Sequence, residues 1–193
     1  MGRDRAPDFS GIEYVFLDRD GVLNRKPAGG GFVTRWEELE LLPKAPEAIA
    51  VLNRSQRTVI VVTNQRGIAL GLFSQDDLER LHDRLCLELS TKGAHLDGIY
   101  VCPHDRGQCN CRKPLTGLFA QAFADFPEAR PDNSVMVGDS LSDIEAGYRL
   151  GMRTVLIADA TDTSTPEMTR AAALAQASLA SLAEFVERLG CDF

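Results

Sequence analysis

Short, continuously apolar runs recur along the chain. Runs without polar alternation are typical of strands that a parallel sheet buries on both faces. On this basis we expect five strands, at residues 14–17, 59–62, 99–101, 135–137 and 155–157.

Stretches with helical spacing of apolar residues lie between these runs. The clearest has leucines at 78, 81, 85 and 89, and Ser74 is well placed to cap its N-terminus. The other predicted helices cover residues 45–54, 115–126 and 142–150. The alternation of strands and helices predicts an α/β fold, a Rossmann-like parallel sheet with helices on both faces.

The length of 193 residues predicts a single domain, residues 1–193. We expect a core at about 12–160, a polar loop at 159–166 and a helical segment at about 166–190. The net charge of −7 argues against a broad basic face for nucleic acid or an anionic membrane. No apolar run is long enough to span a membrane, and the first residues lack the apolar part of a signal peptide. We therefore expect a cytoplasmic protein without membrane or nucleic-acid partners.

Polar residues follow the predicted strands at their carboxyl ends. Asp18 and Asp20 follow the first strand, Thr63 ends the second, and Asp139 follows the fourth with Asp143 four residues on. Ligands of an open parallel sheet bind at this edge, and clustered carboxylates favour a hard cation such as Mg²⁺. The alternative is that these residues only form turns and helix caps. Their joint occurrence favours a site.

Three of the five cysteines lie within ten residues of one another, together with a histidine. Cys102, His104, Cys109 and Cys111 offer the four soft ligands of a closed, structural Zn²⁺ site in a loop at 102–111. The alternative is a set of buried cysteines with an unrelated histidine. Arg112 follows directly, so a metal here would order the cations that enter the neighbouring site.

The segments 16–24, 62–64 and 138–143, together with Lys113, resemble in order the four motifs of the haloacid dehalogenase (HAD) superfamily of phosphohydrolases. The resemblance implies a catalytic Mg²⁺ held by Asp18, the backbone carbonyl of Asp20, and Asp139. It also implies that Asp18 is the nucleophile that forms an aspartyl phosphate, and that Asp20 is the general acid and base. Thr63 and Lys113 would stabilise the transferring phosphoryl group.

The run from Cys102 to Pro114 narrows the resemblance to two branches of this superfamily. One removes the 7-phosphate of D-glycero-D-manno-heptose 1,7-bisphosphate, and the other releases histidinol from its phosphate. Segments 63–71 and 96–102 are closer to the heptose branch, whereas the short gap between His104 and Cys109 is closer to the other. The heptose branch commonly has Ser and Arg where this chain has Arg66 and Leu70.

We therefore expect a phosphatase for a small sugar phosphate, most similar to the heptose branch, with histidinol phosphate or another sugar phosphate as the alternative. The expected substrate ligands are Asn64, Gln65, Arg66 and Arg112, since an arginine can form a bidentate pair with a distal phosphate. Asp143 is expected to orient Lys113 or the outer shell of the metal, and not to bind Mg²⁺ directly. No inserted cap domain is visible, and we expect a monomer. The non-enzyme alternative is a zinc- and phosphate-binding module without turnover.

Overall fold

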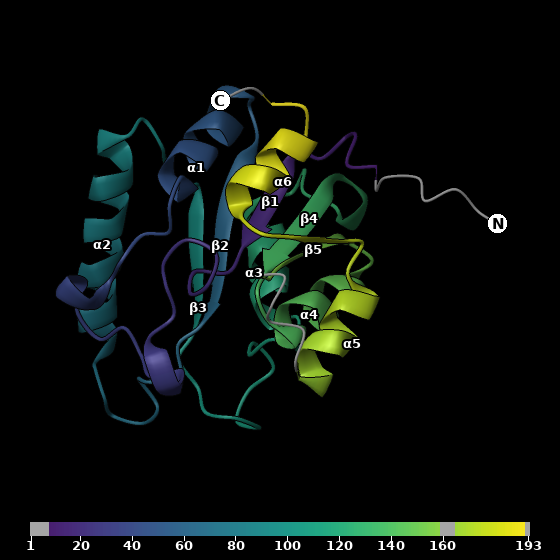
Figure 1. Ribbon diagram of the computed structural model, residues 1–193. Helices are drawn as coiled ribbons and strands as arrows, with labels where there is room; N and C mark the ends of the chain where they lie inside the picture. Colours follow the sequence, from purple (N-terminus) through teal and green to yellow (C-terminus); the bar gives the residue numbers. More distant parts are fainter. Residues whose placement is uncertain (1–7, 159–164, 192–193) are drawn as a thin grey trace.

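One parallel sheet organises the molecule (Figure 1). The computed structural model describes residues 8–158 and 165–191. Within these ranges the strands lie in the order β3-β2-β1-β4-β5-β6, and every neighbouring pair is parallel. The strands are β1 (Tyr14–Leu17), β2 (Thr58–Asn64), β3 (Gly98–Cys102), β4 (Ser134–Gly138), β5 (Arg153–Ile157) and β6 (Ala177–Leu179).

Helices cover both faces of the sheet, as Figure 1 shows. Helices α1 (Ala45–Arg54), α2 (Gln75–Thr91) and α6 (Leu182–Arg188) pack on one face, where Val15, Val61 and Val137 point into the core. Helices α3 (Gly117–Asp125), α4 (Leu141–Leu150) and α5 (Pro166–Leu174) cover the other. Because both faces are covered, the central strands β1 and β4 are completely buried.

Two side-chain caps fix the starts of helices near the site. The Ser74 hydroxyl accepts a hydrogen bond from the backbone N–H of Asp77 at the start of α2, and the Asp77 carboxylate accepts one from Ser74 in return. At the start of α4 the Asp143 carboxylate accepts from both the backbone N–H and the hydroxyl of Ser140. Such contacts satisfy backbone N–H groups that a helix terminus leaves free.

The predicted strands and helices are found with small differences at their ends. The helix expected at 115–126 begins two residues later, because Leu115 is in a turn that donates to the Arg112 carbonyl. The helical segment expected at about 166–190 consists of two helices, α5 and α6, and the expectation missed the strand between them. Helix α5 ends at Leu174 and the chain then forms β6, whose pairing supplies partners for backbone groups at the edge of β5.

Two other expectations fall at or beyond the limits of the described residues. The expected polar loop at 159–166 lies almost entirely outside them, and so do residues 1–7, from which the absence of a signal peptide was inferred. Among the described residues, no helix is both long and apolar enough to cross a membrane.

Candidate active site

The carboxyl ends of β1, β2 and β4 bring the expected site residues to one edge of the sheet. Asp18 follows β1, Thr63 lies at the end of β2, and Asp139 follows β4, which pairs directly with β1. Two close approaches make this edge compact. A Cβ on Gly21 would lie 1.8 Å from an Asp139 carboxylate oxygen, and one on Gly138 would lie 2.2 Å from the Asp143 Cβ. Glycine is therefore required at both positions.

Lys113 is the buried cation of the site. Its ammonium lies 3.1 Å from Asp18 Oδ1 and 2.6 Å from Asp143 Oδ1, and it donates to the Val62 carbonyl at 2.6 Å. These three acceptors match its three N–H donors. Burial lowers the pKa of Lys113, but Asp143 and Asp18 outweigh burial and hold it above its usual value. The expectation that Asp143 orients Lys113 agrees with these contacts.

Three carboxylates form a second feature, an acidic cluster beside Lys113. Asp18, Asp139 and Asp143 each offer an oxygen, and these oxygens lie within 4.8 Å of one another. Burial raises the pKa of Asp18 to about 6 and that of Asp139 to about 7. Burial disfavours the charged form of both carboxylates, and a bound cation would favour that form.

The residues around this cluster fit a bound cation. The ammonium of Lys26 lies 2.6 Å from Asp139 Oδ2, so a positive charge already lies against the carboxylates. Asp139 Oδ1 is buried and has no hydrogen-bond partner among the described residues. An unpartnered carboxylate oxygen beside a second carboxylate is the hard donor set that Mg²⁺ takes. The cluster therefore suits a divalent cation held by Asp18 and Asp139.

The Asp20 carboxylate lies in a network of donors. Arg19 contacts both of its oxygens, at 2.9 and 3.0 Å from Nη2. Asn24 and Gln65 each donate an amide N–H at 2.9 Å. Burial raises the pKa of Asp20, but the Arg19 charge and these hydrogen bonds outweigh burial and hold it below its usual value. A backbone carbonyl contact from Asp20 to a metal stays a prediction.

Two expected substrate ligands in the segment after β2 already have protein partners. Gln65 is 1% exposed and donates to both Asp20 and Thr63, and its contact with substrate stays a prediction. The guanidinium of Arg66 is engaged by Asp105, with Nη2 3.3 Å from Oδ2 and Nε also in contact. Arg66 is therefore held to the loop 102–111 and does not line the neighbouring cavity.

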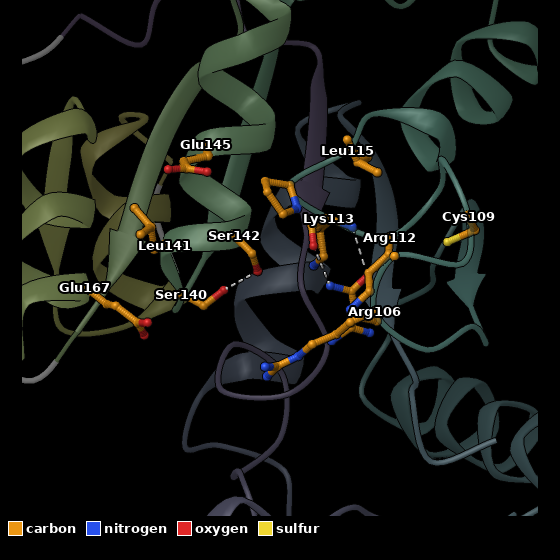
Figure 2. Close-up of a pocket in the computed structure, with 13 residues that line it drawn as sticks. Arg106, Cys109, Arg112, Lys113, Leu115, Ser140, Leu141, Ser142, Glu145 and Glu167 are labelled. Carbon is orange, nitrogen blue, oxygen red and sulfur yellow. Dashed lines mark hydrogen bonds between the residues drawn. The ribbon is translucent and has the colours of Figure 1, made fainter. Parts of the chain in front are cut away.

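A cavity of about 460 Å³ opens beside Lys113. Figure 2 shows Arg106 and Arg112 reaching into it from one side, opposite Ser140 and Ser142 at the start of α4. Arg112 Nη1 is buried and has no hydrogen-bond partner within the described ranges. Asn64 also lines the cavity and holds the Lys113 backbone through both amide atoms, at 3.0 and 3.2 Å. A guanidinium nitrogen left without an acceptor marks a place for an anion.

The ligand atoms of Cys102, His104, Cys109 and Cys111 lie within 4.8 Å of one another. The Cys111 sulfur lies 3.3 Å from that of Cys102 and 3.3 Å from His104 Nδ1. The Cys109 and Cys102 sulfurs are 3.6 Å apart. A tetrahedral site with Zn–S bonds of about 2.3 Å separates its sulfurs by about 3.8 Å, close to these values. The four side chains therefore offer a donor set of the kind that holds one zinc ion.

Three residues that contribute to the observed site were not expected from the sequence. Arg106 lines the cavity, Asp105 holds Arg66, and His82 of α2 lies 3.2 Å from Arg19 Nη1. A signal for His82 was present in the sequence, because it lies on the apolar stripe of its helix and polar residues on such a stripe need a partner. The pairing of Arg66 with Asp105 has no comparable local signal.

Comparison with known proteins agrees with this geometry. A family described as HAD-hydrolase-like matches residues 110–185. A Haemophilus ducreyi protein named D-glycero-beta-D-manno-heptose-1,7-bisphosphate 7-phosphatase is 36% identical over 184 residues, which cover 91% of this chain and 99% of that protein. The chain belongs to this family of HAD phosphatases. It is accordingly an enzyme, a phosphoric monoester hydrolase.

Other members of the family differ in anomer and supply a structural match. A Mycobacterium tuberculosis relative, 42% identical over 137 residues (70% of this chain, 72% of that protein), is named for the alpha anomer of the same bisphosphate. The crystal structure of D,D-heptose 1,7-bisphosphate phosphatase from B. bronchiseptica, complexed with magnesium and phosphate, superposes with a TM-score of 0.80 at 32% identity. The match covers 92% of this chain and 98% of that one. The expected HAD-like α/β fold is confirmed.

Proposed function

We propose that this phosphatase removes the 7-phosphate of D-glycero-D-manno-heptose 1,7-bisphosphate through an aspartyl phosphate on Asp18, with Mg²⁺ bound. The observation that carries the proposal is the position of Arg112. Arg112 lines the cavity beside Lys113, and its Nη1 is buried without a hydrogen-bond partner among the described residues. A substrate with two phosphates supplies one for the nucleophile and one for this guanidinium.

The Asp18 carboxylate attacks phosphorus, and the bond between phosphorus and the C7 oxygen breaks. Asp20 gives its proton to the leaving alkoxide and later takes one from the water that attacks the aspartyl phosphate. That second displacement releases inorganic phosphate and restores Asp18. Asp18, Asp139 and the backbone carbonyl of Asp20 would hold Mg²⁺, whose charge would let a carboxylate approach a phosphate.

Lys113 and Thr63 stabilise the phosphoryl oxygens. The Lys113 ammonium lies 3.1 Å from Asp18 Oδ1, so its charge is next to the atom that the phosphoryl group joins. The Thr63 hydroxyl oxygen accepts a hydrogen bond from Gln65 at 2.9 Å, which leaves the hydroxyl proton available for donation. Asn64 fixes the Lys113 backbone and thereby the start of its side chain.

Zinc, in this proposal, is structural. Cys111 directly precedes Arg112 and Lys113, so a metal held by Cys102, His104, Cys109 and Cys111 fixes the point from which both cations enter the site. The ion takes no part in the chemistry, because all four of its ligand positions are filled by protein.

Phosphate release in the presence of Mg²⁺ tests the proposed function. We expect kcat/KM on one anomer of the heptose bisphosphate to exceed that on histidinol phosphate by about a hundredfold or more, since a second phosphate adds charge-assisted hydrogen bonds. Asp18→Asn is the background control. Equal release by this variant and the native protein would reject the enzyme mechanism, and a preference for histidinol phosphate would reject the substrate.

A further inference from the structure

Arg19 is the largest fully buried side chain among the described residues, and it lies between the two aspartates of the active site. A buried guanidinium is costly unless its donors are satisfied. Nε and Nη2 of Arg19 contact the Asp20 carboxylate, at 3.2 Å and at 2.9–3.0 Å. The remaining terminal nitrogen, Nη1, lies 3.2 Å from Nε2 of His82.

The chemistry of this last contact assigns the state of His82. A guanidinium has only donors, so the Nε2 atom of His82 must accept, and the ring is neutral with its proton on Nδ1. His82 is 8% exposed and lies on the face of α2 that packs against the sheet, and the capping box at Ser74 fixes the start of that helix. The hydrogen bond between His82 and Arg19 thus links α2 to the active site.

We propose that His82 is a positioning residue: by accepting from Arg19 it holds the guanidinium in the plane from which Arg19 orients the Asp20 carboxylate toward the leaving group and the attacking water. The proposal rests on the proposed function, because it takes Asp20 as the general acid and base. Asn24 and Gln65 donate one hydrogen bond each to Asp20, one to each oxygen. The guanidinium alone contacts both oxygens, so its orientation sets that of the carboxylate.

Removing the His82 acceptor leaves Arg19 buried with an unpaired N–H. The guanidinium then gains by turning toward another acceptor, and the carboxylate of Asp20 turns with it. Proton transfer depends on the placement of the carboxylate to a fraction of an ångström, whereas phosphate binding uses other residues. The expected loss is therefore in proton transfer to the leaving group and not in substrate binding.

Leaving-group dependence separates this role from a merely structural one. The heptose bisphosphate expels an alkoxide that needs a proton, whereas 2,4-dinitrophenyl phosphate expels a stable anion that does not. The ratio of kcat/KM for the two substrates reports the proton donated in the first step. It is independent of the fraction of folded enzyme, since both rates come from one sample. His82→Leu removes the acceptor, His82→Gln restores one through its amide oxygen, and Asp20→Asn gives the lower limit of the ratio.

We expect His82→Leu to lower this ratio by about tenfold or more, part of the 10²–10⁴ that general acid catalysis contributes, and His82→Gln to recover it to within about threefold. Leu85→Ala, one turn further along the same buried face of α2, destabilises the helix and is expected to leave the ratio unchanged. An unchanged ratio in His82→Leu, or an equal fall in both His82 variants, would overturn the positioning role. Activity retained in Asp18→Asn would instead overturn the proposed function, so the two failures are distinct.

Discussion

The contact between Asp143 and Lys113 lets us predict how much stability the protein loses when the charge of Asp143 is removed. Asp143 is fully buried, 2.6 Å from the Lys113 ammonium, and its other oxygen accepts from the Ser140 backbone and hydroxyl, at 3.1 and 2.6 Å. Asp143→Asn keeps the volume and an oxygen for the cap but removes the charge. Breaking a buried pair in this way typically costs about 3–5 kcal/mol, because the partner charge stays buried without full compensation. We expect the free energy of unfolding to fall by about 3 kcal/mol.

The matched control is Ser140→Ala, which removes one hydrogen bond of the cap and leaves the ion pair intact. It should cost about 1 kcal/mol. Urea denaturation of both variants without divalent metal gives the comparison. We also expect kcat of Asp143→Asn to fall by about a hundredfold, since Lys113 loses the partner that orients it toward the phosphoryl group. A loss of stability no larger than that of Ser140→Ala would refute the reasoning, because the ion pair would then contribute nothing beyond the cap.

Three further predictions concern single features of the site. Arg112→Lys should raise KM for the bisphosphate by about tenfold and leave KM for heptose 7-phosphate unchanged, because lysine cannot form the bidentate pair; equal effects on both substrates would contradict its role. Cys109→Ser should lose zinc, measured by elemental analysis, and melt at a lower temperature; full activity in a verified zinc-free protein would contradict the positioning role of the metal. Burial and the Arg19 charge lower the pKa of His82 from 6.5 to about 3. Below pH 6.5 His82 therefore binds a proton in the unfolded chain but stays neutral in the folded protein. Between pH 7 and pH 5.5 the native protein should lose about 1 kcal/mol more stability than His82→Gln, measured by urea denaturation. Equal losses in the two proteins would show that the pKa of His82 is the same in the folded and unfolded states.

The sequence by itself determined the features that local pattern encodes. Buried strands of a parallel sheet are continuously apolar, so the expected core strands were found where the runs occur. Parallel strands place their carboxyl ends at the same edge of the sheet, so residues that follow different strands, such as Asp18 and Asp139, were expected to lie close together. The cysteine cluster was equally local, because its four side chains lie within ten residues of chain.

Only the tertiary structure decided which distant side chains pair. Arg66 was expected to contact a phosphate, yet its guanidinium forms an ion pair with Asp105, 39 residues away. His82 and Arg19 are 63 residues apart and come within hydrogen-bond distance only in the folded chain. The strand β6 formed in place of a helix because the edge of β5 offered backbone partners. Local sequence sets which residues are apolar, helical or charged, whereas the partner of a buried charge depends on the packing of elements distant in the chain.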